Sequence, residues 1–172
     1  MDLKAHIRTI PDFPKPGILF YDISTLLGHG EAWRETVDRV ADAVRAYRPD
    51  VLAAIESRGF IFAAPVAYKL GVGFTMVRKV GKLPGPVVSH AYDLEYGSDT
   101  LQVADGLNAP GSRVVLIDDL LATGGTAQAS VELLRKVGAE VVGAVFLIEL
   151  MGLKGRARLD VPLTTLLGYA GG

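Results

Sequence analysis

The sequence predicts an α/β domain in which helices flank a mostly parallel central sheet. Helical and strand-like patterns alternate along the chain, as they do when parallel strands are joined by helical crossovers. The chain has 172 residues, enough for one domain with a buried core. Its composition, 49% hydrophobic and 22% charged, is ordinary for a globular protein. We therefore expect residues 1–172 to form a single domain.

The first half of the chain contains two helix-then-strand units. Apolar residues recur at helical spacing over residues 32–48, and a short apolar run at 51–55 predicts a buried strand. A second helical pattern runs from about 60 to 70 and stops at Gly71, a suitable C-terminal cap. Residues 74–77 are expected to form the next strand.

Residues 79–97 interrupt this order with glycines, prolines and polar residues. A loop of this length inside a compact domain tends to be functional, often as a lid. Its second half, together with residues 100–103, could close as a β-hairpin. A strand at 113–117, a helix at about 126–137 and a last central strand at 141–148 complete the pattern.

Charge and composition exclude several classes of function. The net charge of −1 gives no general attraction to nucleic acid or to an anionic membrane. Without cysteine the chain can form no disulfide, thiolate zinc site or cysteine nucleophile. The longest apolar stretch, 141–150, contains Glu149 and is too short to span a bilayer. We expect a soluble cytoplasmic protein with neither nucleic-acid nor membrane partners.

The most informative segment is residues 114–126, an apolar strand followed by Asp118, Asp119 and a loop of small residues that enters a helix. Ligands of parallel α/β sheets bind beyond the carboxyl ends of strands, where free N–H groups at a helix start can hold a phosphate. Gly124 and Gly125 permit close backbone approach. The carboxylates could accept hydrogen bonds from sugar hydroxyls or bind a bridging Mg²⁺. The alternative is a solvated turn and helix cap.

This segment resembles the phosphoribosyl pyrophosphate signature of the type I phosphoribosyltransferases, and Asp-Asp-Leu-Leu-Ala-Thr-Gly-Gly-Thr resembles their adenine-specific branch. The resemblance implies the type I phosphoribosyltransferase fold, with an N-terminal hood at about 1–25 and a flexible hairpin lid at about 79–100. It implies that Asp118 and Asp119 bind the ribose hydroxyls. The implied 5-phosphate ligands are Ala122, Thr123, Gly124, Gly125 and Thr126. Mg²⁺ is the implied cofactor, held mainly by substrate and waters rather than directly by the protein.

Residues 10–20 resemble the family's base-binding hood. Three prolines and a glycine make this segment stiff, and its aromatic rings could stack on a base for roughly 1–3 kcal/mol. The implied adenine ligands are Leu19, Phe20, Tyr21, Leu120 and Leu150, with adenine stacked on Phe20. Phe20 could instead be a hydrophobic staple over the core. Tyr21 stands where the family usually has arginine, which removes any guanidinium contact but leaves backbone recognition.

A second anion site is expected where the strand at 51–55 enters the next helix. The turn resembles the family's pyrophosphate loop, which often contains a cis peptide, here between Glu56 and Ser57. The implied pyrophosphate ligands are Glu56, Ser57, Arg58 and Gly59, with the basic residues Arg78, Lys79 and Lys82. Two alternatives stay open: that Arg58 merely pairs with Glu56, and that the basic residues form a solvated face.

Glu95, in a string similar to the adenine enzymes' loop, is the implied acid/base at the purine ring, and Arg58 is the other implied catalytic residue. As a lone glutamate, Glu95 could also be a plain surface residue. The implied reaction converts adenine and phosphoribosyl pyrophosphate into AMP and pyrophosphate by displacement at the anomeric carbon. The resemblance also implies a homodimer, in which basic residues of one subunit reach the site of the other. The rivals are transfer to another purine such as xanthine, and a non-catalytic phosphoribosyl pyrophosphate sensor.

Overall fold

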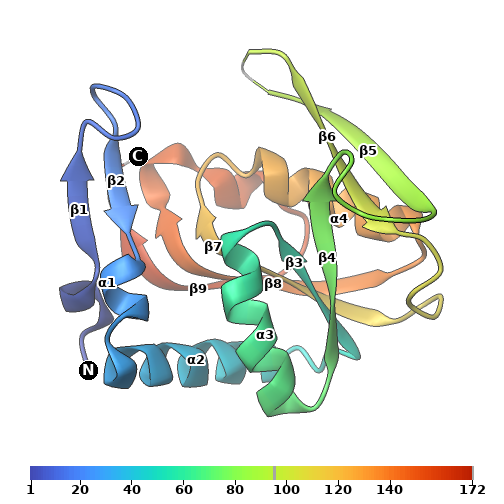
Figure 1. Cartoon of the computed structure of the whole chain (residues 1–172), viewed down its shortest axis with the longest axis horizontal. Coiled ribbons are helices and arrows are strands. Elements are labelled where there is room, and N and C mark those ends of the chain that lie inside the picture. The colour runs from blue at the N-terminus through green and yellow to red at the C-terminus, as the bar shows by residue number, and fades with distance from the viewer. Residues whose placement is uncertain (95, 172) are drawn as a thin grey trace.

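A seven-stranded sheet forms the centre of the computed structural model, which describes residues 1–94 and 96–171 (Figure 1). The strand order is β5-β6-β4-β3-β7-β8-β9, and the last five of these strands are mutually parallel. The parallel strands are β3 (Val51–Ile55), β4 (Gly73–Lys79), β7 (Arg113–Leu121), β8 (Glu140–Leu150) and β9 (Leu163–Tyr169). The expectation of a mostly parallel sheet is confirmed.

Helices cover both faces of this sheet. α2 (Gly30–Arg45) and α3 (Arg58–Leu70) pack on one face, and α4 (Gly125–Lys136) packs on the other. Because successive strand residues point to opposite faces, Ile117 joins the first layer while its neighbour Leu116 joins the second. The central strands are therefore buried on both sides, which explains their uninterrupted apolar sequences.

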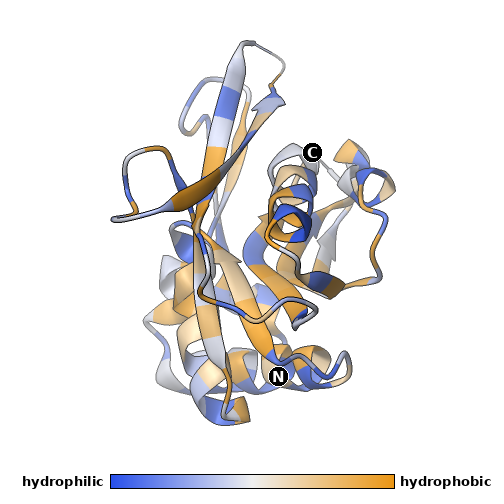
Figure 2. Ribbon diagram, turned by 90° about the vertical axis from the view of Figure 1, so that its right-hand side faces the viewer, coloured by the Kyte–Doolittle hydropathy of each residue, from blue (hydrophilic) through white to orange (hydrophobic). Residues whose placement is uncertain are grey.

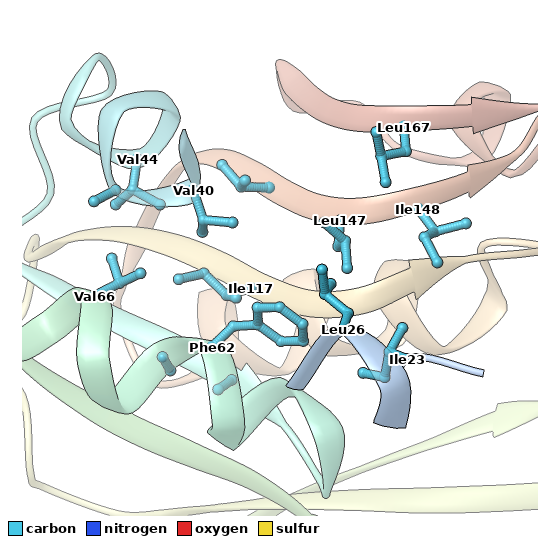
Figure 3. Close-up of a cluster of buried hydrophobic side chains, with 14 of the residues drawn as sticks. Ile23, Leu26, Val40, Val44, Phe62, Val66, Ile117, Leu147, Ile148 and Leu167 are labelled. Atoms are coloured by element: carbon cyan, nitrogen blue, oxygen red, sulfur yellow. The ribbon is translucent and has the colours of Figure 1, made fainter. Parts of the chain in front are cut away.

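The larger core lies between the sheet and the α2–α3 layer. Figure 3 shows Val40 and Val44 of α2 and Phe62 and Val66 of α3 directed toward strand residues that include Ile117. These helical positions are four residues apart in each case, so they lie on one face of their helix. This packing holds the carboxyl ends of β3 and β7 in place.

The N-terminal hood is a separate antiparallel ribbon of β1 (Arg8–Pro11) and β2 (Leu19–Asp22). It is preceded by the 3₁₀ helix η1 (Leu3–His6) and followed by the short helix α1 (Ser24–Leu27). The rings of Tyr21 and Tyr169 are 4.2 Å apart, so the ribbon packs against the end of β9 (Figure 1).

The expected hairpin is present as β5 (Val87–Asp93) and β6 (Ser98–Ala104), which pair antiparallel. β6 also pairs antiparallel with β4, and the strands β5 and β6 extend beyond the rest of the sheet (Figures 1 and 2). The base of the hairpin packs on α4, where His90 Nε2 lies 2.7 Å from a carboxylate oxygen of Glu132.

Several predicted boundaries were wrong. β7 continues through the two aspartates to Leu121 instead of ending before them, and α3 already begins at Arg58. α2 ends at Arg45, and Arg48 beyond it has a φ of 51°, which no right-handed helix contains. β8 is the last central strand, as expected, but the edge strand β9 that follows it was not predicted. β9 is only partly buried, so it lacks the continuous apolar run that marks the central strands.

Two short 3₁₀ helices, η2 (Met151–Leu153) and η3 (Gly155–Arg158), connect β8 to β9. The buried Glu149 carboxylate accepts hydrogen bonds from Arg156 Nη2 and the Thr165 hydroxyl, both at 2.8 Å. Hydrogen bonds from Arg156 are the main cause of the lowered pKa of Glu149, so this group is structural. Within the described residues, no helix is both long and apolar enough to span a bilayer.

Candidate active site

A cavity of about 260 Å³ opens at the carboxyl ends of β3 and β7. It brings together eleven of the residues singled out from the sequence, which come from three separate segments of the chain. They are Glu56, Arg58, Lys79, Asp118, Asp119, Leu120, Ala122, Thr123, Gly124, Gly125 and Thr126. The position agrees with the rule that ligands of parallel sheets bind at this end of the strands.

The loop between β7 and α4 has a conformation that depends on glycine. Gly124 has a φ of 87°, and a Cβ atom built on it would lie 2.6 Å from the carbonyl oxygen of Gly155. Any side chain there would clash with backbone. Gly125 begins α4, whose first turn presents N–H groups without helical acceptors. The loop and helix start therefore form a site suited to a phosphate.

Asp118 and Asp119 lie side by side at the edge of this cavity. Burial raises the pKa of Asp118 well above its usual value, and the adjacent charge of Asp119 raises it further. The Asp119 N–H donates to Asp118 Oδ1 at 2.9 Å, which partly offsets these effects. Asp119 is 7% exposed, and Arg58 Nε donates to its Oδ2 at 2.5 Å. Two carboxylates and one guanidinium thus form a compact charged cluster.

The turn from β3 into α3 has the geometry expected of the family's second anion site. The Glu56–Ser57 peptide bond is cis, as the resemblance implied. A Cβ atom on Gly59 would lie 3.0 Å from the carbonyl oxygen of Ile117 and 3.1 Å from Asp118 Oδ1. Gly59 therefore lets the first turn of α3 approach the aspartates closely. Ser57 and Gly59 shape this turn and do not line the cavity.

The basic residues after β4 have different environments. Glu56 Oε1 accepts a hydrogen bond from the Lys79 N–H at 2.6 Å and lies 3.5 Å from Arg78 Nε. Glu56 therefore pairs with Arg78, and the alternative in which it pairs with Arg58 is wrong. The Lys79 ammonium lines the cavity and pairs with Asp99. Of the basic residues expected to contact pyrophosphate, Arg78 and the exposed Lys82 do not line the cavity.

The expected base-binding residues lie on the hood strand β2 and on the central strands β7 and β8. Phe20 contacts Phe13 edge-on, with ring centres 5.1 Å apart, and is not among the side chains packed on the two described core clusters. Its position therefore favours a binding surface over a core staple. Leu120 lines the cavity, and Leu150 is 9% exposed at the end of β8. Leu19 is exposed on β2. Glu95 lies outside the described residues.

Sequence reasoning missed the segment η3, which packs against the loop between β7 and α4, the proposed phosphate loop. A Cβ atom on Gly155 would collide with the carbonyl oxygen of Ala122, so η3 packs against the loop backbone to backbone. Arg158, at the end of η3, reaches the start of α4. Nothing in the local pattern around residue 155 marks this contact, because its partners lie about thirty positions earlier in the chain.

Comparison with known proteins gives consistent matches. Residues 29–163 match the Phosphoribosyl transferase domain family. The chain is 64% identical over 169 residues to the adenine phosphoribosyltransferase of Gluconacetobacter diazotrophicus, covering 98% of this chain and 96% of the relative. It is 60% identical over 169 residues to that of Rhodospirillum centenum, covering 98% and 99%.

Solved structures agree with these matches. Adenine phosphoribosyltransferase from Thermoanaerobacter pseudethanolicus superposes with a TM-score of 0.94 at 46% identity, covering 98% of both chains. The Saccharomyces cerevisiae enzyme, solved with adenine and an imino-altritol bisphosphate, superposes with a TM-score of 0.90 at 38% identity, covering 96% of this chain and 97% of the other.

Proposed function

We infer the roles of the site residues from one premise: the chain belongs to the phosphoribosyltransferase family, and within it to the adenine phosphoribosyltransferases. It transfers the phosphoribosyl group of phosphoribosyl pyrophosphate to adenine, giving AMP and pyrophosphate. The observation that carries this assignment is the near-complete coverage at 60% and 64% identity. The assignment of roles to individual residues is our proposal.

The phosphate loop and the aspartates are proposed to hold the phosphoribosyl group. The 5-phosphate would bind the N–H groups at the start of α4 and the hydroxyls of Thr123 and Thr126, which line the cavity. Asp118 and Asp119 would accept hydrogen bonds from the two ribose hydroxyls. Arg58 would bind the pyrophosphate, with the Lys79 ammonium nearby. Arg78 and Lys82, which lie outside the cavity lining, are assigned to the same pyrophosphate by the resemblance alone.

The donor set also fits a magnesium ion, which we propose as the cofactor. Mg²⁺ is usually bound through one or two carboxylates together with substrate phosphates and waters. Asp118 and Asp119 supply carboxylates at the cavity, while no group of three His, Cys, Asp or Glu among the described residues could hold a metal. Bound Mg²⁺ would neutralise part of the pyrophosphate charge as that group leaves.

Adenine is proposed to bind between the hood and the cavity. Its ring would stack on Phe20, and the backbone of Leu19 and Tyr21 would recognise its polar edge. Leu120 and Leu150 would form the opposite apolar wall. Phe20 is free for this role because it packs edge-on against Phe13 rather than into the core. Backbone recognition makes the tyrosine at position 21 compatible with adenine binding.

The reaction is proposed to proceed by direct displacement. Adenine N9 forms a bond to the anomeric carbon as the bond from that carbon to the pyrophosphate oxygen breaks, with inversion and with oxocarbenium character in the sugar. Arg58 would stabilise the charge on the leaving group. Glu95 would exchange a proton with the purine near N7. The hairpin would close over the site and exclude water that could hydrolyse the sugar.

We also propose that the enzyme acts as a cytoplasmic homodimer. The absence of cysteine suits a reducing compartment. Ile61 and Tyr68 of α3 are both exposed and lie two helical turns apart on one helix face, which gives α3 an apolar strip for a second copy of the chain. Light scattering of the purified protein would test this, and a monomer at working concentrations would contradict it.

The function is tested by pyrophosphate release with phosphoribosyl pyrophosphate, Mg²⁺ and one base at a time. Turnover with adenine alone, abolished by Asp118→Asn and Asp119→Asn, is the expected result. Turnover with xanthine or another purine would retain the mechanism but overturn the hood assignment. Binding of phosphoribosyl pyrophosphate without turnover for any base would instead support a sensor.

A further inference from the structure

A second cavity, of about 370 Å³, lies on the hairpin side of the phosphate loop. Its walls are Thr123, Gly125 and Thr126 of the loop, Asp93 and Leu94 of the hairpin, and Arg158 of η3. The loop residues are shared with the cavity at the ends of β3 and β7, so the two cavities meet at the proposed 5-phosphate site. Arg158 is the cationic side chain in the lining of this second cavity.

The Arg158 guanidinium is held directly beside the first residue of α4. Its Nη1 atom lies 3.3 Å from the position that a Cβ atom on Gly125 would occupy, and its Nη2 atom donates to Gln128 Oε1 at 3.1 Å. Gln128 is one turn further along α4, so the contact fixes the guanidinium at the N-terminal end of the helix. A guanidinium has five N–H donors, and the bond to Gln128 uses one of them.

Backbone packing explains why an arginine three residues after Gly155 reaches this place. Gly124 and Gly155 are in contact without side chains between them, which brings η3 against the loop. Lys154 has a φ of 56° and turns the chain into η3. The two glycines therefore set the distance between Arg158 and the loop, and the position of the guanidinium follows from the fold.

We propose that Arg158 is a ligand of the substrate's 5-phosphate, binding it from the cavity on the hairpin side of the loop. This inference rests on the proposed function, because it assigns a further residue to the same phosphate site. The phosphate monoester carries close to two negative charges at neutral pH, and its oxygens can accept both helix N–H groups and a planar guanidinium fork. A Cβ atom on Gly125 would lie 3.3 Å from Nη1, so glycine at this position leaves the guanidinium close to the loop backbone.

The test compares the binding of AMP with the binding of adenosine, which lacks only the phosphate. Isothermal titration calorimetry would be carried out on the wild-type protein, Arg158→Ala, Arg158→Lys and a control, Arg135→Ala. The control variant removes a positive charge from the same surface, where Arg135 pairs with Asp160 at 2.9 Å. Arg135 does not line the second cavity. We expect Arg158→Ala to lower the affinity for AMP by about tenfold or more and the affinity for adenosine by less than about twofold.

A pH series adds a readout that a merely structural role would not change. The second ionisation of a phosphate monoester has a pKa of about 6, so the AMP affinity lost in Arg158→Ala should increase between about pH 5.5 and 7.5. Arg158→Lys should recover part of the affinity because it keeps the charge without the fork. The Arg135→Ala control should bind AMP like the wild type.

Other outcomes would overturn the inference. Unchanged AMP affinity in Arg158→Ala would show that Arg158 is not a phosphate ligand. An equal loss of affinity for AMP and for adenosine would show that Arg158 supports the hairpin or the fold instead of binding the phosphate. Neither outcome would affect the proposed function, which fails if the wild-type protein does not turn over adenine. The two failures are therefore distinguishable.

Discussion

Arg58 and Asp119 are bound to each other, with Arg58 Nε 2.5 Å from Asp119 Oδ2 at the edge of the cavity. Arg58 comes from the first turn of the helix α3 and Asp119 from the strand β7, so the pair links the sheet to a helix that packs on it. The two side chains are proposed to bind different parts of phosphoribosyl pyrophosphate. Substrate binding must then exchange their mutual contact for contacts with pyrophosphate and ribose.

The first prediction concerns this exchange. Arg58→Ala should raise the KM for phosphoribosyl pyrophosphate by about 10- to 100-fold, as expected for losing a hydrogen bond to a charged group, and should leave the KM for adenine within about threefold. Steady-state kinetics with each substrate varied would measure this. Arg45→Ala, which breaks an exposed pair with Asp42, is the control and should behave as wild type. Equal changes in both KM values would contradict the assigned role.

The second prediction concerns the pH dependence of stability. The pKa of Asp118 is raised in the folded protein, so the folded state binds this proton more readily than the unfolded state. The charged carboxylate therefore destabilises the fold at neutral pH, and this cost is relieved as the pH falls through the folded pKa toward the usual value of 3.8. Asp118→Asn should be more stable than wild type at pH 7, and the difference should shrink with acidification.

Urea unfolding of both proteins between about pH 7 and pH 5 would measure this difference, and the same variant should lack transferase activity. Asn preserves an oxygen that can accept the Asp119 N–H, so the comparison isolates the charge. A variant less stable than wild type at neutral pH would show that the ionised Asp118 is stabilised by contacts in the fold.

The third prediction concerns the support of the phosphate loop. Gly155→Ala would place a Cβ atom against the carbonyl oxygen of Ala122. The Cβ atom is fixed to one stretch of backbone and the oxygen belongs to another, so neither can move aside easily. We expect a loss of about 1–3 kcal/mol in the free energy of unfolding, together with weaker binding of phosphoribosyl pyrophosphate. Gly30→Ala is the matched control, because a Cβ atom there meets nothing within 4 Å. Full stability of Gly155→Ala would show that the loop can move away from η3.

The fourth prediction concerns the hood. Tyr21 and Tyr169 stack with ring centres 4.2 Å apart, and Lys4 Nζ lies 4.4 Å from the centre of the Tyr169 ring. Tyr169→Ala should loosen β2 and raise the KM for adenine by about 2- to 12-fold, which is the range expected for an aromatic pair. Tyr169→Phe keeps the ring and should retain the wild-type KM. A change confined to the KM for phosphoribosyl pyrophosphate would contradict this role for the stack.

Contiguous features were predictable from the sequence. The segment from Val114 to Thr126 contains a buried strand, two carboxylates, a glycine pair and a helix start. These features lie next to one another in the sequence, so a short stretch of it is enough to recognise them. The alternation of helix and strand predicted the parallel sheet for the same reason, because hydrophobic periodicity is a local property. The half-exposed strand β9 was missed because one buried face gives a much weaker pattern.

The fold class, the phosphate loop and the two aspartates were predictable from local sequence, since each depends on neighbouring residues and on backbone propensities. Which distant side chains meet became visible only in the folded chain. The pairing of Arg58 with Asp119 spans 61 positions, and Gly155 and Arg158 reach the loop through a segment with no pattern of its own. Such contacts follow from strand order and from close packing between elements, and local periodicity contains no information about either.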